Sequence, residues 1–149
     1  SHPYDAYTLE QVESLPDHDE AKAYFTAMKS AATISKEDAV DLFLESTALA
    51  NKPGELLQYS YWISHGGIRT VDDHRFVYIM RKIAATMGDE RSDPEAARAE
   101  LRSAFGQSDE ENNKFLIEVD EEISRRLAEM NRRRLELIGL PITQKQTGG

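Results

Sequence analysis

Apolar residues recur at intervals of three and four along most of the chain, a spacing that places them on one face of an α-helix. Such stripes cover residues 18–32, 36–50, 55–64, 71–87, 94–105 and 109–138, and a shorter turn of helix is expected over 9–15. No segment alternates apolar and polar residues over the length of a strand, and no Asn-Gly or Asp-Gly pair marks a hairpin. The pattern therefore predicts an all-α fold, an irregular bundle of about six helices that ends in one long amphipathic helix.

Residues that favour the ends of helices lie between these stripes. In five places a serine or threonine is followed three residues later by Glu, Gln or Asp: Thr8–Gln11, Ser35–Asp38, Thr70–Asp73, Ser92–Glu95 and Ser108–Glu111. A hydroxyl at the helix start accepts from a free backbone N–H, and the second side chain reaches back to the cap. Glycines at 54, 66, 67, 88, 106 and 139 are expected to end helices.

The chain has 149 residues, the size of one ordinary domain. We expect a single helical domain over residues 1–140. Pro141 follows Gly139 and cannot continue a helix, so residues 141–149 are expected to form an extended polar C-terminal tail.

The segment 109–138 would form a helix about 45 Å long. Its apolar seam is interrupted by Arg134, and the other seam positions are Leu116, Val119, Ile123, Leu127, Met130 and Leu137. Acidic residues lie early in the segment and arginines lie late, which suits the helix dipole. Three Glu–Arg pairs four residues apart are predicted to neutralise the arginines: Glu121–Arg125, Glu122–Arg126 and Glu129–Arg133.

A helix of this length cannot bury its whole seam on shorter helices, so we expect part of it to face a protein partner or a second copy. The expected contact residues there are Met130, Arg134 and Leu137. Tyr59 and Trp62 lie three apart on the short helix expected over 55–64, which is rich in aromatic residues. They are further candidates for partner binding. Packing in the core is the alternative for this aromatic pair.

The formal net charge is −9, and residues 1–60 carry 11 acidic residues against 4 lysines. This charge disfavours direct binding to nucleic acid, because it repels phosphates. The chain has no cysteine and no apolar run of the roughly 20 residues that a membrane helix requires. We therefore expect a cytoplasmic protein that does not bind membranes.

Three short stretches carry candidate chemistry. They contain His18 among acidic residues, His65 before Gly66 and Gly67, and His74 within Asp72-Asp73-His74-Arg75. None of them has the spacing of a helical zinc or iron site, and consecutive helix positions diverge. Helix capping explains the acidic residues better, so no catalytic residue, metal site or cofactor is predicted.

The function expected from these features is that of a non-enzymatic protein-interaction or assembly subunit, such as an adaptor, connector, chaperone or accessory subunit of a larger complex. One alternative is an inhibitor whose acidic N-terminal half mimics nucleic acid. Another is a small helical enzyme or ligand-binding regulatory domain, with His65, His74 and the tyrosines as its candidate residues.

Overall fold

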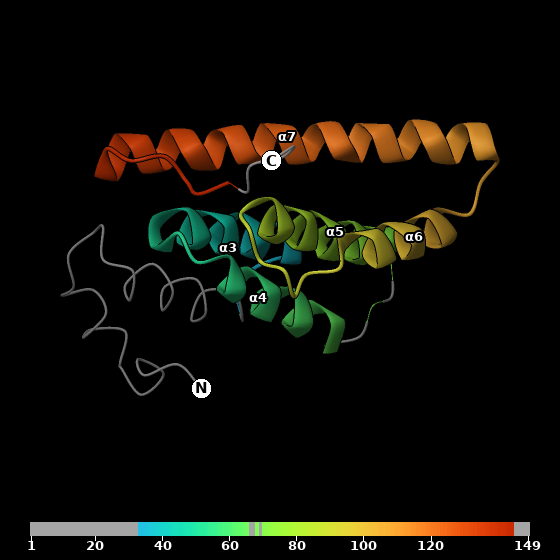
Figure 1. Cartoon of the computed structure of the whole chain (residues 1–149). Coiled ribbons are helices and arrows are strands. Elements are labelled where there is room, and N and C mark those ends of the chain that lie inside the picture. The colour runs from blue at the N-terminus through green and yellow to red at the C-terminus, as the bar shows by residue number, and fades with distance from the viewer. Residues whose placement is uncertain (1–32, 66–67, 69, 145–149) are drawn as a thin grey trace. The chain divides into compact units, whose positions relative to one another are not determined.

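A computed structural model describes residues 33–65, 68 and 70–144, apart from the side chains of Trp62 and His65. The described residues form α-helices joined by short loops, without a strand (Figure 1). The helices are α3 (Lys36–Ala50), α4 (Pro53–His65), α5 (Val71–Thr86), α6 (Pro94–Phe105) and α7 (Asp109–Ile138). The all-α prediction is confirmed for this part of the chain. The helices predicted over 9–15 and 18–32 lie outside the described residues, so the total of about six stays a prediction.

Several predicted caps begin the helices as expected. Thr70 and Asp73 form a complete capping box at α5, in which the Thr70 hydroxyl accepts from the Asp73 amide and the Asp73 carboxylate accepts from the Thr70 amide. At α3 the Ser35 hydroxyl accepts from the Asp38 amide, and at α7 the Ser108 hydroxyl accepts from the Glu111 amide. The predicted Thr8–Gln11 cap lies outside the described residues.

Two predicted helix boundaries are wrong. Ser92 does not cap α6, because Asp93 accepts from the Ala96 amide while the Ser92 hydroxyl donates to the carbonyl of Arg81. Gly54 does not end a helix, because it lies within the first turn of α4. Asn51 ends α3 instead, with φ 55° in the left-handed region that a helix C-cap requires.

The chain divides into two compact units. Unit 1 comprises residues 1–52 and 130–142, and unit 2 comprises residues 53–129 and 143–149. Helix α7 contributes residues to both units. Whether residues 1–140 unfold as one cooperative domain is not tested by this division, so the single domain stays a prediction.

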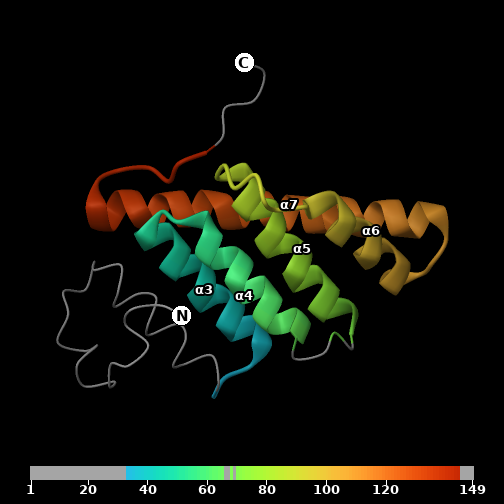
Figure 2. The same ribbon diagram turned by 60° about the horizontal axis from the view of Figure 1, so that its bottom comes forward.

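Unit 2 has its core among α4, α5, α6 and the first part of α7. Helices α4 and α5 lie side by side, and α6 packs beside α5 (Figure 2). Phe105 and Phe115 stack with their ring centroids 4.1 Å apart, which joins the end of α6 to the start of α7. The most deeply buried large side chains of this unit are Leu56, Tyr59, Ile63, Tyr78, Ile79, Met80, Ile83, Leu101 and Leu116.

The described part of unit 1 consists of residues 33–52, which contain α3, and residues 130–142. Helix α3 is buried over most of its surface, with Ala39, Val40 and Phe43 fully inaccessible to solvent. The expected extended tail begins after Gly139 (φ 83°) and is not helical. It does not leave the fold at once, because Ile142 is buried and its amide donates to the Asn131 side-chain oxygen at 3.1 Å. Residues 145–149 lie outside the described part of the chain.

Candidate functional site

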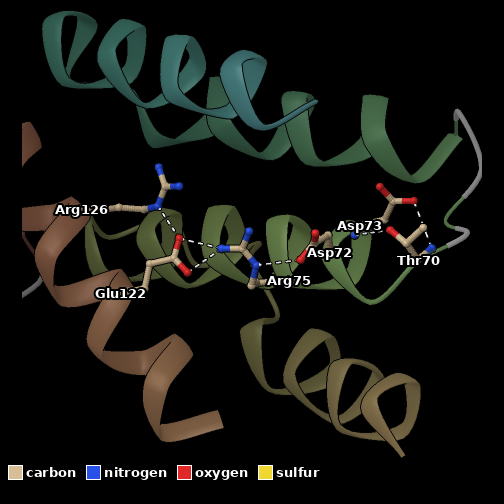
Figure 3. Close-up of polar contacts among 6 residues, drawn as sticks. All are labelled: Thr70, Asp72, Asp73, Arg75, Glu122 and Arg126. Carbon is tan, nitrogen blue, oxygen red and sulfur yellow. Dashed lines mark hydrogen bonds and ion pairs between the residues drawn. The ribbon is translucent and has the colours of Figure 1, made fainter. Parts of the chain in front are cut away.

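Charged side chains gather in unit 2 where α5 meets α7, and Glu122 is at their centre (Figure 3). The Nη1 group of Arg75 donates to both Glu122 oxygens at 2.5 and 2.8 Å, and Arg126 Nε donates to Glu122 Oε2 at 2.9 Å. Arg75 also donates from Nε to Asp72 and lies over the Phe76 ring. Each of the three central side chains is at most one-fifth exposed. The cluster therefore ties α5 to α7 in a partly dry environment.

The Glu122 carboxylate remains charged because its partners outweigh the cost of burial. Burial alone would raise its pKa, but the hydrogen bonds and positive charges of Arg126 and Arg75 lower the pKa below the ordinary value. A carboxylate that accepts from two guanidinium groups forms strong charge-assisted hydrogen bonds. The geometry is that of a structural contact between α5 and α7, in which both oxygens of Glu122 already accept hydrogen bonds.

A second group of hydrogen bonds joins α5, α6 and α7 at Asp120 of α7. The Tyr78 hydroxyl of α5 donates to Asp120 Oδ1, and Arg98 Nη2 of α6 donates to Asp120 Oδ2 at 2.8 Å. Burial, followed by the hydrogen bond and negative charge of Asp120, raises the pKa of Tyr78 well above its ordinary value. Tyr78 therefore remains a neutral hydrogen-bond donor under ordinary conditions.

A cleft of about 430 Å³ opens beside Asp120, within unit 2. Its walls come from α5, α6 and the first part of α7. They carry cationic, anionic, hydroxyl and apolar groups, namely Tyr78, Lys82, Thr86, Glu95, Arg98, Asp120, Ile123, Ser124 and Leu127. The sequence does not indicate this cleft, because its residues come from three separate helices and none of them stands in a recognisable motif.

Of the stretches that suggested chemistry, only Asp72–Arg75 lies wholly within the described residues, and its side chains do not converge on a reacting centre. Asp73 caps α5 and Arg75 reaches Glu122, so these neighbours serve different helices. His74 lies on a shallow surface with Glu100 and Ser103 of α6. His18 and the side chain of His65 lie outside the described residues. Within the part of the chain that the structure describes, no group of three or more His, Asp or Glu side chains could hold a metal ion.

The predicted partner-binding residues lie in different surroundings. Tyr59 and Met130 are buried within the protein, at 1% and 3% exposure, whereas Leu137 is 38% exposed. The side chain of Trp62 is not described. Core packing, the alternative for the aromatic helix, is therefore what the structure shows for Tyr59. Partner binding by the set as a whole stays a prediction.

Arg134, which interrupts the apolar seam of α7, has a partner inside unit 1. Its Nη1 group donates to the carbonyls of Ala48 and Leu49 at 3.1 and 2.6 Å. These are among the last carbonyls of α3, which lack partners within their own helix. A positive charge at this end also opposes the helix dipole. Helix α3 has no basic residue in its own last turn, so a cation from α7 takes that role.

Most arginines of α7 are paired, but only one of the three predicted pairs forms. Glu122–Arg126 is confirmed, whereas Glu121–Arg125 and Glu129–Arg133 are absent from the described residues. Arg133 instead pairs with Glu45 of α3 at 3.3 Å and more loosely with Glu136. Arg132 pairs with Glu136 at 2.6 Å. For Arg133 a contact with α3 replaces the predicted pair, because an exposed pair four residues apart is worth only about 0.2–0.5 kcal/mol.

The last turns of α7 and the residue that follows Gly139 expose large apolar side chains. Leu135, Leu137 and Leu140 are 44%, 38% and 56% exposed. We call these three residues the apolar end of α7. Among the described residues, no helix is long and apolar enough to pass through a lipid bilayer.

The comparisons with known proteins give no match. No protein-family model, no curated protein and no solved structure matches this chain. The site is therefore interpreted from its own geometry.

Proposed function

We propose that the protein is a non-enzymatic protein-interaction or assembly subunit that docks through the apolar end of α7. The observation that carries this proposal is the exposure of Leu135, Leu137 and Leu140 within one short stretch. Covering the exposed part of each leucine would contribute a fraction of the roughly 1.5–3 kcal/mol that full burial of such a side chain contributes. Several large apolar side chains exposed near one helix end favour a surface that another protein covers.

The charged groups of the protein support the same proposal. Asp73, Asp120 and Glu122 each accept hydrogen bonds that hold helices in place. A general acid or base needs access to substrate and a pKa near the working pH. The pKa of Glu122 is lowered and the pKa of Tyr78 is raised, so both are shifted away from a neutral working pH.

The partner would be another protein or a second copy of this chain. Exposed leucines on a charged helix suit an apolar groove with a polar rim, the usual composition of a protein interface. We place this activity in the cytoplasm, because the chain has no cysteine and needs none for its core.

A paired substitution tests the proposal. Leu135→Glu combined with Leu140→Glu should abolish capture of a partner in affinity purification from the native source, or self-association in size exclusion with light scattering. Ile117→Glu is the matched control, since Ile117 is 55% exposed on α7 but lies in unit 2. A monomeric wild-type protein without a co-purifying partner would overturn the proposal, as would equal loss in the control.

A further inference from the structure

The cleft of unit 2 has walls that are held by hydrogen bonds. Tyr78 of α5 and Arg98 of α6 both donate to Asp120 of α7, so a single carboxylate fixes the three helices around the opening. The hydroxyl of Ser124 donates to the backbone carbonyl of Asp120, and that of Thr86 to the carbonyl of Lys82. A site held in this way exists before a ligand arrives, which reduces the entropic cost of binding.

Two charged side chains on the cleft wall are not engaged. Lys82 of α5 and Glu95 of α6 make no hydrogen bond or ion pair with the described residues. Lys82 is half-buried, whereas Glu95 is exposed at the rim. By contrast, both oxygens of Asp120 are occupied by Tyr78 and Arg98. The cleft thus offers one free positive group and one free negative group.

The apolar part of the cleft wall comes from two side chains, Ile123 and Leu127. Ile123 is 4% exposed and Leu127 is half-buried, and both lie on α7. The volume of about 430 Å³ falls in the range of small-molecule sites, roughly 300–1,000 Å³. A matching ligand is small, carries opposite charges at separate atoms and has an apolar body.

We propose that this cleft binds a free amino acid with an apolar side chain. The carboxylate of the ligand would lie at Lys82, beside the guanidinium of Arg98. Its ammonium group would lie at Glu95, and its side chain would pack on Ile123 and Leu127. Glu95 and Asp120 disfavour a phosphate ester or another dianion, because they place negative charge on the same wall. This inference is independent of the docking function proposed for the apolar end of α7.

Calorimetric titration with matched ligands tests the zwitterion requirement. L-Leucine, L-methionine and L-phenylalanine are the probes. The fragments 4-methylpentanoate and isoamylamine each retain the leucine side chain but only one of its charges. We expect an amino acid probe to bind, and each fragment to bind at least about tenfold more weakly, since it loses one charge-assisted hydrogen bond. No heat from any probe up to about 10 mM would overturn the proposal. A fragment that binds as tightly as leucine would also overturn it.

Substitutions then test the location. Lys82→Met and Glu95→Gln should each weaken binding of the best probe by about tenfold or more. Neither side chain takes part in an internal pair, so both variants should keep the circular dichroism and melting temperature of the wild type. Lys114→Met and Glu118→Gln are controls on exposed positions of α7, and they should bind as the wild type does. Unchanged binding in both cleft variants would show that the ligand binds elsewhere.

Discussion

Residues 109–129 and residues 130–138 of α7 differ in the hydrogen bonds that their charged side chains make. In residues 109–129, which belong to unit 2, Asp120 and Glu122 accept hydrogen bonds from cationic and hydroxyl side chains. In residues 130–138, which belong to unit 1, Arg134 donates to backbone carbonyls at the end of α3. In the first stretch these two carboxylates pair with side chains. The second stretch also has side-chain pairs, Arg133–Glu45 and Arg132–Glu136, and in addition completes the end of a neighbouring helix. Helix α7 therefore provides hydrogen-bond acceptors for α5 and α6 and a hydrogen-bond donor for α3.

The two stretches also differ in how completely their buried polar atoms are satisfied. Both oxygens of Glu122 accept hydrogen bonds. In the second stretch the Nε atom of Arg134 is buried, and no hydrogen bond reaches it from the described residues. A buried polar group without a partner costs about 1–3 kcal/mol. We therefore expect the tie at Glu122 to contribute more to stability than the one at Arg134.

The largest effect is expected from Glu122→Ala. This change leaves Arg75 and Arg126 with no shared carboxylate while they are only 15% and 18% exposed. Removal of one member of such a buried pair should lower the free energy of unfolding by about 3 kcal/mol, measured by urea denaturation. Glu121→Ala is the control at an exposed neighbouring position and should change stability by less than about 0.5 kcal/mol.

The pH dependence of the same pair separates charge from packing. The pKa of Glu122 lies below its ordinary value of 4.5 in the folded protein. As the pH falls from 4.5 toward the folded pKa, the unfolded chain binds the proton first, so this contribution to stability is lost. Glu122→Gln removes the contribution at every pH. The stability difference between wild type and Glu122→Gln should therefore shrink on acidification, and a constant difference would contradict the assigned role.

A smaller effect is expected from Arg134→Met, which keeps the apolar stem and removes the donors to Ala48 and Leu49. The two carbonyls lose a charge-assisted partner at the end of α3, so the free energy of unfolding should fall by about 2 kcal/mol in the same assay. Arg125→Met is the control, because Arg125 is exposed and unpaired within the described residues. A loss larger than that of Glu122→Ala would reverse the order inferred for the two stretches.

The smallest effect is expected at the helix starts. Thr70→Ala breaks a reciprocal capping box in unit 2, whereas Ser35→Ala breaks a cap in unit 1 in which only the hydroxyl accepts. We expect Thr70→Ala to cost about 1 kcal/mol and Ser35→Ala about half as much, measured by thermal denaturation. Equal losses at the two positions would show that the reciprocal carboxylate of Asp73 adds nothing.

Local structure was largely predictable from the sequence. The stripe over 36–50 and the segment 109–138 coincide with α3 and α7, because apolar period and capping residues act within a few neighbouring positions. The failure at Ser92 has a local cause, since two adjacent residues can both cap and Asp93 takes the position. The Glu129–Arg133 prediction failed for a tertiary reason, because Glu45 lies within reach of Arg133.

The candidate sites were not predictable in the same way. The cleft depends on Tyr78, Arg98 and Asp120 meeting across three helices, and no spacing along the chain encodes that meeting. Arg134 was recognised as unusual because it interrupts an apolar seam. Its role depends on the carbonyls of α3, which periodicity cannot reveal.

The Arg134 contacts also bear on the order in which the protein is assembled. They join residues 85 and 86 positions apart, whereas Arg98 and Asp120 are separated by 22. Closing the longer loop costs about 1 kcal/mol more in chain entropy. During synthesis α3 leaves the ribosome long before its capping arginine exists, so its C-terminal carbonyls remain hydrated until α7 is made. We therefore expect the Arg134 contacts of unit 1 to form after the α5–α6 packing of unit 2, whose residues lie close together in the chain.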